Sequence, residues 1–130
     1  MAEEGISLTQ AEWNVMECLW EAGPLTGREV TRQMEESCGW SRSTTLTLLS
    51  RLEAKGAVES VQPERGPKVF SALLRREDAA LRETEEFLGR VYQGSLSLMV
   101  SALTQKQALS REELDELYEL LKGLEEERHD

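Results

Sequence analysis

Helix start and stop signals alternate closely along the first 56 residues of the chain. Thr9 followed by Glu12 is a capping box, in which each side chain accepts a hydrogen bond from the other residue's backbone N–H. Apolar residues then recur at helical spacing until Gly23-Pro24 ends the pattern. These signals predict a helix over about 10–22.

A second capping box opens the next helical pattern. Thr26 followed by Glu29 provides it, and Gly39 ends the apolar periodicity. The sequence therefore predicts a helix over about 27–37. The next connection, SCGW, is short and contains glycine, as a helix-turn-helix motif requires.

A third helix is predicted over about 42–55, with Ser41 as its cap and Gly56 as the residue that ends it. Its sequence combines the leucines of a buried helix with a row of Ser and Thr hydroxyls, which are mediocre helix formers. Helical spacing assigns the buried face to Thr45, Leu48, Leu49 and Leu52. The outward face then holds Ser43, Thr44, Leu46, Thr47, Ser50 and Arg51.

Two short segments rich in Val and Phe, AVESVQ and VFSALL, follow Gly56. The loop PERGPK between them contains proline, glycine and charged residues, so the pattern predicts a β-hairpin. Three compact helices followed by a hairpin are the element order of a winged helix-turn-helix domain. Its wing loop, about 62–68, carries Arg65 and Lys68.

Three amphipathic helices are predicted in the rest of the chain. The first covers 77–91, the second is the apolar segment SLSLMVSAL, and the third starts at a capping box formed by Ser110 and Glu113. So short a region rarely folds without help, and a second copy of the chain is the simplest partner for its apolar stripes. The predicted fold class is mainly α with a small β-hairpin wing. It comprises a winged helix-turn-helix domain (1–75) and a three-helix dimerisation region (76–130).

The distribution of charge leaves nucleic acid open as a partner, although the formal net charge is −10. The segment 42–75 is locally basic. Its acids are Glu53, Glu59 and Glu64. Its bases are Arg42, Arg51, Lys55, Arg65, Lys68 and Arg75. Exposed charges more than about 8 Å apart are largely screened at physiological salt, so acidic residues elsewhere barely oppose a phosphate bound here.

Nothing in the sequence favours an enzyme. His129 is the only histidine and stands at the end of the chain, which removes the commonest general base and metal ligand. No Gly-rich phosphate loop, G-x-S-x-G elbow or H-E-x-x-H motif occurs. Cys18 and Cys38 lack C-x-x-C spacing, so we expect reduced thiols without a role in chemistry. The sequence therefore predicts no catalytic activity, no cofactor and no metal.

The remaining large apolar side chains and the chain start were also considered. Core packing is expected for Trp13, Trp20, Trp40, Met16, Met34 and Met99. No apolar run approaches the roughly 18 residues of a membrane span, and the start MAEEGISL lacks the basic-then-apolar pattern of a leader. The expected localisation is the cytoplasm.

The hydroxyl-rich outward face of the helix at 42–55 suits DNA recognition. A recognition helix lies in the major groove, where Ser and Thr hydroxyls bond phosphates or base edges, Arg grips guanine and a Leu or Thr methyl meets the thymine methyl. Surface Ser and Thr are often merely solvated, however. An acidic winged-helix domain could equally serve as a protein-interaction module that never touches DNA. The sequence leaves both hypotheses open, and the local basic segment favours DNA.

Several strings along the chain resemble one family. They are LTQAEWNVMECLW, LTGREV, W-S-x-S-T-x-x-T-L-L-x-R-L-x-x-K-G, the G-x-x-V-F hairpin, FLGRVYQGSLSLMV and LSREELDELYELL. Together, from about Ile6 to Leu124, they resemble the penicillinase repressor (BlaI/MecI/CopY) family of winged-helix transcriptional regulators. The resemblance implies a homodimeric bacterial repressor that binds an inverted-repeat operator in double-stranded DNA and interlocks through its C-terminal helices.

The resemblance, together with the local charge, assigns candidate residues to two surfaces. The expected DNA-binding residues, from the recognition helix (about 42–55) and the wing (about 62–68), are Arg42, Ser43, Thr44, Leu46, Thr47, Arg51, Lys55, Arg65 and Lys68. The expected dimerisation residues are Leu88, Tyr92, Leu96, Met99, Leu103, Leu114, Leu117, Tyr118 and Leu121.

Two departures from the family pattern concern the release of the repressor. In one branch a membrane-bound sensor metalloprotease triggers induction and the repressor is cut at an Asn-Phe bond, but the matching residues here are Ser101 and Ala102. The copper-responsive branch carries a C-terminal cluster of cysteine pairs, and this chain has no cysteine after Cys38. Neither release by the same cut nor copper sensing is therefore expected.

Overall fold

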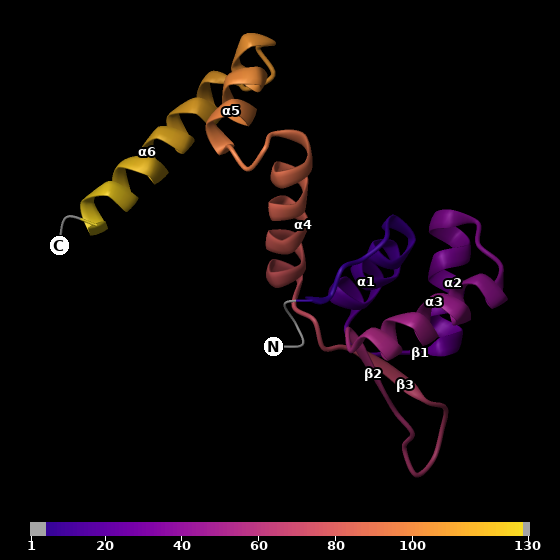
Figure 1. Ribbon diagram of the computed structural model, residues 1–130. Coiled ribbons are helices and arrows are strands. Elements are labelled where there is room, and N and C mark those ends of the chain that lie inside the picture. Colours follow the sequence, from indigo (N-terminus) through magenta and orange to yellow (C-terminus); the bar gives the residue numbers. More distant parts are fainter. Residues whose placement is uncertain (1–4, 129–130) are drawn as a thin grey trace. The chain divides into compact units, whose positions relative to one another are not determined.

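The computed structural model describes residues 5–128 (Figure 1), so His129 lies outside the described residues. The elements in chain order are α1 (Gln10–Ala22), β1 (Leu25–Thr26), α2 (Gly27–Cys38), α3 (Arg42–Lys55), β2 (Val58–Val61), β3 (Val69–Ala72), α4 (Arg76–Val91), α5 (Leu96–Gln105) and α6 (Arg111–Arg128). The chain divides into two compact units, one ending at Thr84 and the other beginning at Glu85. The separate domains 1–75 and 76–130 stay a prediction.

The first two helices begin at the predicted capping boxes. Thr9 Oγ1 accepts from the Glu12 amide at 3.1 Å, while Glu12 Oε1 accepts from the Thr9 amide at 2.8 Å. Thr26 and Glu29 repeat this exchange at 3.2 and 2.8 Å. Each exchange satisfies two amides that a helix start otherwise leaves without a partner, which fixes the first turn.

The predicted hairpin is part of a three-stranded antiparallel sheet of order β1-β3-β2. Its two long strands pair from Val58 opposite Ala72 to Val61 opposite Val69. The sequence prediction missed β1, which pairs Leu25 with Phe70. A strand of two residues is too short for alternation to reveal, and it ends at the residue that caps α2.

The core of the first unit lies among α1, α2, α3 and the sheet. It contains Val15, Met16, Leu19, Val30, Met34, Leu48, Leu49, Leu52, Val58 and Phe70, together with Leu74 and Ala79 near the start of α4. The predicted buried face of α3 is confirmed, since Thr45 is buried beside its three leucines. Figure 1 shows α1, α2 and α3 gathered above the sheet, with the loop between β2 and β3 extending away from them.

A cationic and aromatic cluster fastens the beginning of α4 to α1. The Arg76 guanidinium lies 6.0 Å from the ring centroid of Trp13 and 5.8 Å from that of Trp20, and its Nη2 is 3.0 Å from Glu17 Oε2. Trp20 Nε1 donates to the Leu74 carbonyl at 2.9 Å. The hydrogen bond from Arg76, with a second from Trp13, holds the pKa of Glu17 below its ordinary value. Both indoles therefore pack against the core as predicted.

The second unit has helices but little interior. Neither α5 nor α6 has a buried residue. Met16 and Met34 are buried as predicted, but the expectation that Met99 lies in the core was wrong, because α5 leaves it only half-buried in the single chain. The large apolar residues that stay exposed in α5 and α6 are Leu96, Leu98, Tyr118, Leu120, Leu121 and Leu124.

Candidate nucleic-acid interface

The candidate surface is the outward side of α3. Ser41 caps the helix by accepting from the Thr44 amide at 3.3 Å, and Gly56 ends it in the left-handed conformation at φ 84°. Left-handed backbone favours glycine, which explains the sharp stop. Because Thr45 and the leucines face the core, the other side of the helix faces solvent. Its exposed residues are Arg42, Ser43, Thr44, Thr47, Ser50 and Arg51.

Four of the predicted DNA-binding residues line one shallow hollow. They are Ser43, Thr44, Thr47 and Arg51, and the hollow is completed by Ala11, Trp40 and Leu48. Its volume is about 350 Å³. The fold thus gathers three hydroxyls and a guanidinium at one side of the helix, and these groups can donate to phosphate oxygens and base acceptors.

The hydroxyls at the start of α3 contact one another. The Ser41 Oγ lies 3.2 Å from the Ser43 Oγ and 3.1 Å from the Thr44 Oγ1. All three side chains are exposed. A hydroxyl both donates and accepts, so each can keep this contact and still offer a hydrogen bond outward.

Leu46 differs from its neighbours because it is half-buried and packs against the core. A Cβ built on Gly27 would lie 3.7 Å from the Leu46 Cδ2 and 3.5 Å from the Phe70 Cε1. The start of α2 therefore passes close to α3, and part of the Leu46 side chain fills this junction. The exposed remainder is what could meet a base.

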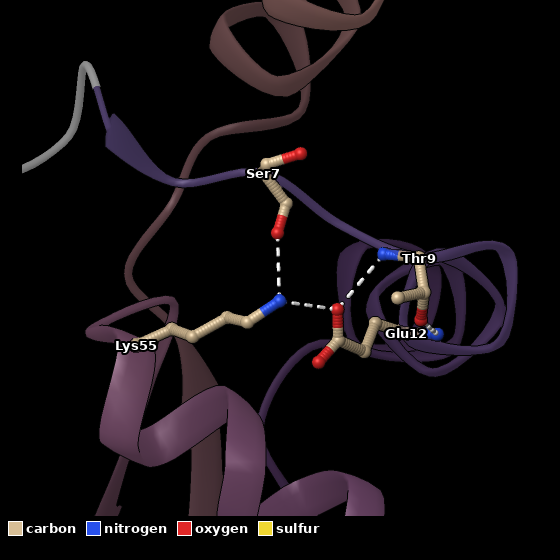
Figure 2. A network of polar contacts seen from close by, with 4 residues as sticks. All are labelled: Ser7, Thr9, Glu12 and Lys55. Carbon is tan, nitrogen blue, oxygen red and sulfur yellow. Dashed lines mark hydrogen bonds and ion pairs between the residues drawn. The ribbon is translucent and has the colours of Figure 1, made fainter.

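Lys55, another predicted DNA-binding residue, is held by the protein itself (Figure 2). Its ammonium donates to the Ser7 carbonyl at 2.7 Å and to the Glu12 Oε1 at 2.6 Å. The same carboxylate accepts from the Thr9 amide, so one buried acid joins the end of α3 to the start of α1. Sequence reasoning missed this contact because no pattern links residues 43 positions apart.

The network changes the acidity of Glu12. Burial by itself raises the pKa of this carboxyl, but the hydrogen bond and charge of Lys55, with the bonds from Thr9, outweigh it. The net result is a pKa below the ordinary 4.5. Glu12 is therefore ionised at neutral pH, and the positive charge of Lys55 is largely compensated.

The wing places the two remaining predicted bases on an exposed loop. Arg65 and Lys68 are both exposed. Gly66 has φ 102°, and its carbonyl accepts from the Gln62 Nε2 at 2.9 Å, which orders the turn. The Lys68 Nζ lies 6.0 Å from the ring centroid of Phe70. These bases are free to reach a nucleic-acid backbone.

Two exposed arginines on α2 are not among the DNA-binding residues predicted from the sequence. Arg28 and Arg32 are exposed one helical turn apart and, with Arg42 from α3, line a second hollow. Their i, i+4 spacing is visible in the sequence, but both lie outside the locally basic segment 42–75 that supplied the candidate bases.

The predicted dimerisation residues lie on the three C-terminal helices and the turn after α4. Half-buried among them are Leu88, Tyr92, Met99, Leu103, Leu114 and Leu117, and the exposed ones are Leu96, Tyr118 and Leu121. The Tyr92 ring meets the Phe87 ring edge-on with centroids 5.9 Å apart. All nine remain candidates for an interface.

No metal site is formed by the described residues: nowhere in 5–128 do three or more His, Cys, Asp or Glu side chains converge to hold an ion. Cys18 and Cys38 are free thiols. Burial, with a smaller contribution from Glu21, raises the pKa of the Cys18 thiol, and that thiol donates to the Gln33 Oε1 at 3.2 Å. Within the same described range, no helix is both long and apolar enough to cross a membrane.

Comparison with known sequences decides the family. The sequence profile of the penicillinase repressor family matches residues 8–123. The chain belongs to the penicillinase repressor family. The family resemblance expected from the sequence strings is thereby confirmed.

The relatives in this family extend over nearly the whole chain. A penicillinase repressor from Bacillus licheniformis is 32% identical over 114 residues, or 88% of this chain and 88% of the relative. The methicillin resistance regulatory protein MecI from Staphylococcus aureus is 26% identical over 123 residues, or 93% of this chain and 98% of the relative. These relatives are named as repressors and regulators, not as enzymes.

Solved structures support the winged-helix fold of the first unit. The monomeric form of BlaI from Bacillus licheniformis, in complex with the blaP half-operator, is 27% identical with a TM-score of 0.51 and covers 56% of this chain and 88% of that chain. The DNA-binding domain of the repressor BlaI is 28% identical with a TM-score of 0.50, covering 55% and 85%. The predicted mainly helical winged-helix class is confirmed, with a third strand added.

Proposed function

We propose that this protein is a homodimeric transcriptional repressor that binds an inverted-repeat DNA operator through α3 and the wing. The observation that carries the proposal is the hollow on α3, where Ser43, Thr44, Thr47 and Arg51 stand together on the solvent side of a capped helix. A BlaI repressor of the same fold is described in complex with half an operator. Covering the promoter would then block transcription.

Base reading and backbone contact fall to different residues in this proposal. Arg51 and the hydroxyls of α3 face the major groove, where guanidinium and hydroxyl groups read base edges. Arg42, Arg65 and Lys68 contact phosphates, which position the protein without reading sequence. Lys55 adds little, because Glu12 already compensates its charge.

The salt dependence of binding follows from this assignment. Arg42, Arg51, Arg65 and Lys68 give eight bases in a dimer. If half of them neutralise phosphates, log K falls against log salt with a slope of about −3 to −4. Counting Lys55 as a fifth base per subunit would give a steeper slope of about −4 to −5.

The dimer is proposed from the apolar residues of the second unit. Leucines along α6 and α5 remain uncovered in the single chain, and burying such side chains is worth about 1.5–3 kcal/mol each. A two-fold dimer presents two α3 helices to successive major grooves, about 34 Å apart. The operator should therefore be an inverted repeat with half-sites about one helical turn apart.

Three further parts of the proposal concern what the protein does not do and where it works. We infer no catalytic activity and a cytoplasmic location, as for a DNA-bound regulator. Ser101 and Ala102, which the sequence resemblance matches to the family's cleavage pair, lie within α5. We therefore infer that the sensor protease of that branch does not release this repressor by the same cut.

The test is fluorescence anisotropy of labelled DNA from the promoter upstream of the protein's own gene, titrated with protein at several salt concentrations. The expected result is binding at least about 1,000-fold tighter than to random duplex at the same salt. Equal affinity for both duplexes at every salt concentration would exclude sequence-specific operator binding. Complete absence of binding would favour a protein-interaction module instead.

A further inference from the structure

Three arginines converge on one hollow outside the base-reading side of α3. Arg28 and Arg32 come from α2, and Arg42 is the first residue of α3. Thr31 and Glu35 complete the lining of this arginine hollow, whose volume is about 610 Å³. The candidate DNA-binding residues predicted from the sequence include only Arg42 of this group.

Charge compensation at the arginine hollow is weak. The hydrogen bonds from Thr26 lower the pKa of Glu29 most, and the charge of Arg32 adds only a smaller effect. No ion pair within 4.0 Å joins Arg28, Arg32 or Arg42 to a carboxylate of the described chain. Glu35 is the one acid in the lining. Three guanidinium groups therefore share a concave surface with one carboxylate. The net positive charge of this lining attracts an anion, because a concave surface concentrates the electrostatic field.

A polar atom in the same lining also lacks a partner. The Thr31 Oγ1 is buried and has no hydrogen-bond partner among the described residues. An unsatisfied buried hydroxyl typically costs about 1–3 kcal/mol. Rotation of the Thr31 side chain would bring this hydroxyl to the surface of the hollow, where it would be a neutral donor beside the three cationic ones.

The position of the hollow relative to α3 indicates the kind of anion. Arg42 directly precedes Ser43, which lines the candidate base-reading hollow. Helix-turn-helix proteins insert the recognition helix into the groove while the preceding helix crosses the sugar-phosphate backbone. The anion nearest to α2 in such a complex is a phosphodiester.

We propose that the arginine hollow binds phosphodiester groups of the operator backbone just beyond the bases that α3 reads. The inference rests on the proposed DNA-binding function and extends its footprint to α2. Arginine forks match the two free oxygens of a phosphodiester, so each can donate two parallel hydrogen bonds. Such contacts strengthen binding to any duplex and set the register, but they carry no sequence preference.

The first test removes the two arginines that are specific to α2. The full-length double variant Arg28→Ala/Arg32→Ala should bind operator and random duplex about tenfold or more weakly, by the same factor for both. A dimer has four such arginines. If half of them also neutralise phosphates, the slope of log K against log salt for the wild type is about −5 to −6. The double variant lacks these contacts, so its slope should be about −3 to −4, as expected from α3 and the wing alone. Anisotropy across salt measures both quantities.

A matched control separates a local contact from net charge. The double variant Lys122→Ala/Arg128→Ala removes the same charge from exposed positions on α6. It should leave both the affinity and the slope unchanged. Because all four positions are exposed, thermal unfolding by circular dichroism should be the same for both double variants.

Two single variants test the lining with opposite signs. Glu35→Gln removes the only carboxylate in the hollow and should tighten binding to both duplexes two- to fivefold. Thr31→Val keeps the shape but removes the donor, and should weaken binding to both duplexes by a similar factor. Phosphate-ethylation interference should show phosphates at the edge of the half-site whose modification blocks the wild type but not Arg28→Ala/Arg32→Ala.

The outcomes distinguish this inference from the proposed function. If wild type binds no operator specifically, the proposed function fails. If wild type binds specifically and Arg28→Ala/Arg32→Ala keeps its affinity, slope and ethylation pattern, the arginine hollow does not contact DNA. Loss of operator binding with random-duplex binding intact would also overturn it, since that result means base reading.

Discussion

The two compact units differ in how they use apolar residues. In the unit ending at Thr84, α1, α2, α3 and the sheet enclose a core in which Leu49 is 1% exposed. In the unit beginning at Glu85, α5 and α6 bury nothing completely, and Leu121 is 52% exposed. The first unit is therefore stabilised by its own core. The second unit leaves apolar side chains exposed to solvent in the single chain.

This contrast supports the proposal that the first unit binds DNA and the second unit forms the dimer. A buried face fixes which side of α3 faces out, so the hydroxyls have a defined geometry before DNA arrives. Helices with uncovered leucines gain stability when a partner buries them, so in the proposed dimer the folding of that unit would be linked to dimerisation.

The largest expected effect comes from removing the same side chain from each unit. Leu49→Ala should lower the free energy of unfolding by about 2–5 kcal/mol, because it leaves a cavity in a closed core. Leu121→Ala should cost less than about 1 kcal/mol at concentrations where the chain is monomeric. Urea denaturation measures both, and equal losses would contradict the contrast between the units.

A charge introduced into the proposed dimer interface should separate the subunits without unfolding the first unit. Leu117→Glu places a carboxylate on the apolar stripe of α6, where burial of an unpaired charge costs several kcal/mol. We expect a monomer by size exclusion, with the melting of the first unit unchanged. Glu116→Gln, at a neighbouring exposed position, is the control and should stay dimeric. A dimeric Leu117→Glu protein would show that the interface lies elsewhere.

A substitution on α3 should have the opposite effect, weakening DNA binding while the dimer is retained. Arg51→Ala should weaken operator binding by about 1–3 kcal/mol and relax specificity at one base pair, while the dimer stays intact. Anisotropy with operator and random duplex gives the affinities, and size exclusion gives the oligomeric state. Ser50→Ala, next to it but outside the lined hollow, provides the comparison. Equal binding by wild type and Arg51→Ala would exclude this side of α3 as the reading surface.

The buried ion pair of the first unit should make the stability of the protein depend on pH. The folded-state pKa of Glu12 is depressed, so its contribution is fully present above about pH 4.5 and is lost as the pH falls through the lower folded value. Glu12→Gln should lower the free energy of unfolding by about 1–2 kcal/mol at pH 7 and flatten the decline in stability below pH 4.5.

The control is an exposed ion pair in α6. Arg111 Nε and Asp115 Oδ1 are 3.6 Å apart, and Asp115→Asn should change the free energy of unfolding little. Urea titrations at pH 7, 5, 4 and 3 measure this, and parallel curves for wild type and Glu12→Gln would contradict the role of the buried pair.

The sequence predicted the elements well where local signals specify them. Capping boxes at Thr9 and Thr26 and the glycine at position 56 act through neighbouring backbone groups, so helix bounds followed from spacing alone. The buried side of α3 followed from periodicity in the same way. Local chemistry determines these features, and no knowledge of the fold was needed.

What the sequence did not predict depends on contacts between distant residues. The strand β1 exists only because Leu25 lies beside Phe70. Lys55 looks like a free cation until Glu12 is brought against it, and the arginine hollow forms only when α2 and α3 are adjacent. Candidate site residues chosen by charge and position alone therefore include a compensated lysine and omit the two α2 arginines that we propose as phosphate contacts.

The cluster around Arg76 sets the minimum length of a separable DNA-binding fragment. A fragment cut after Arg75 would lose the guanidinium that covers Trp13 and Trp20, and with it the buried Ala79. Two indole faces would then meet water, and Glu17 would lose its cationic partner. The shortest piece suited to spectroscopy or crystallisation with DNA therefore retains the first two turns of α4, to about Thr84.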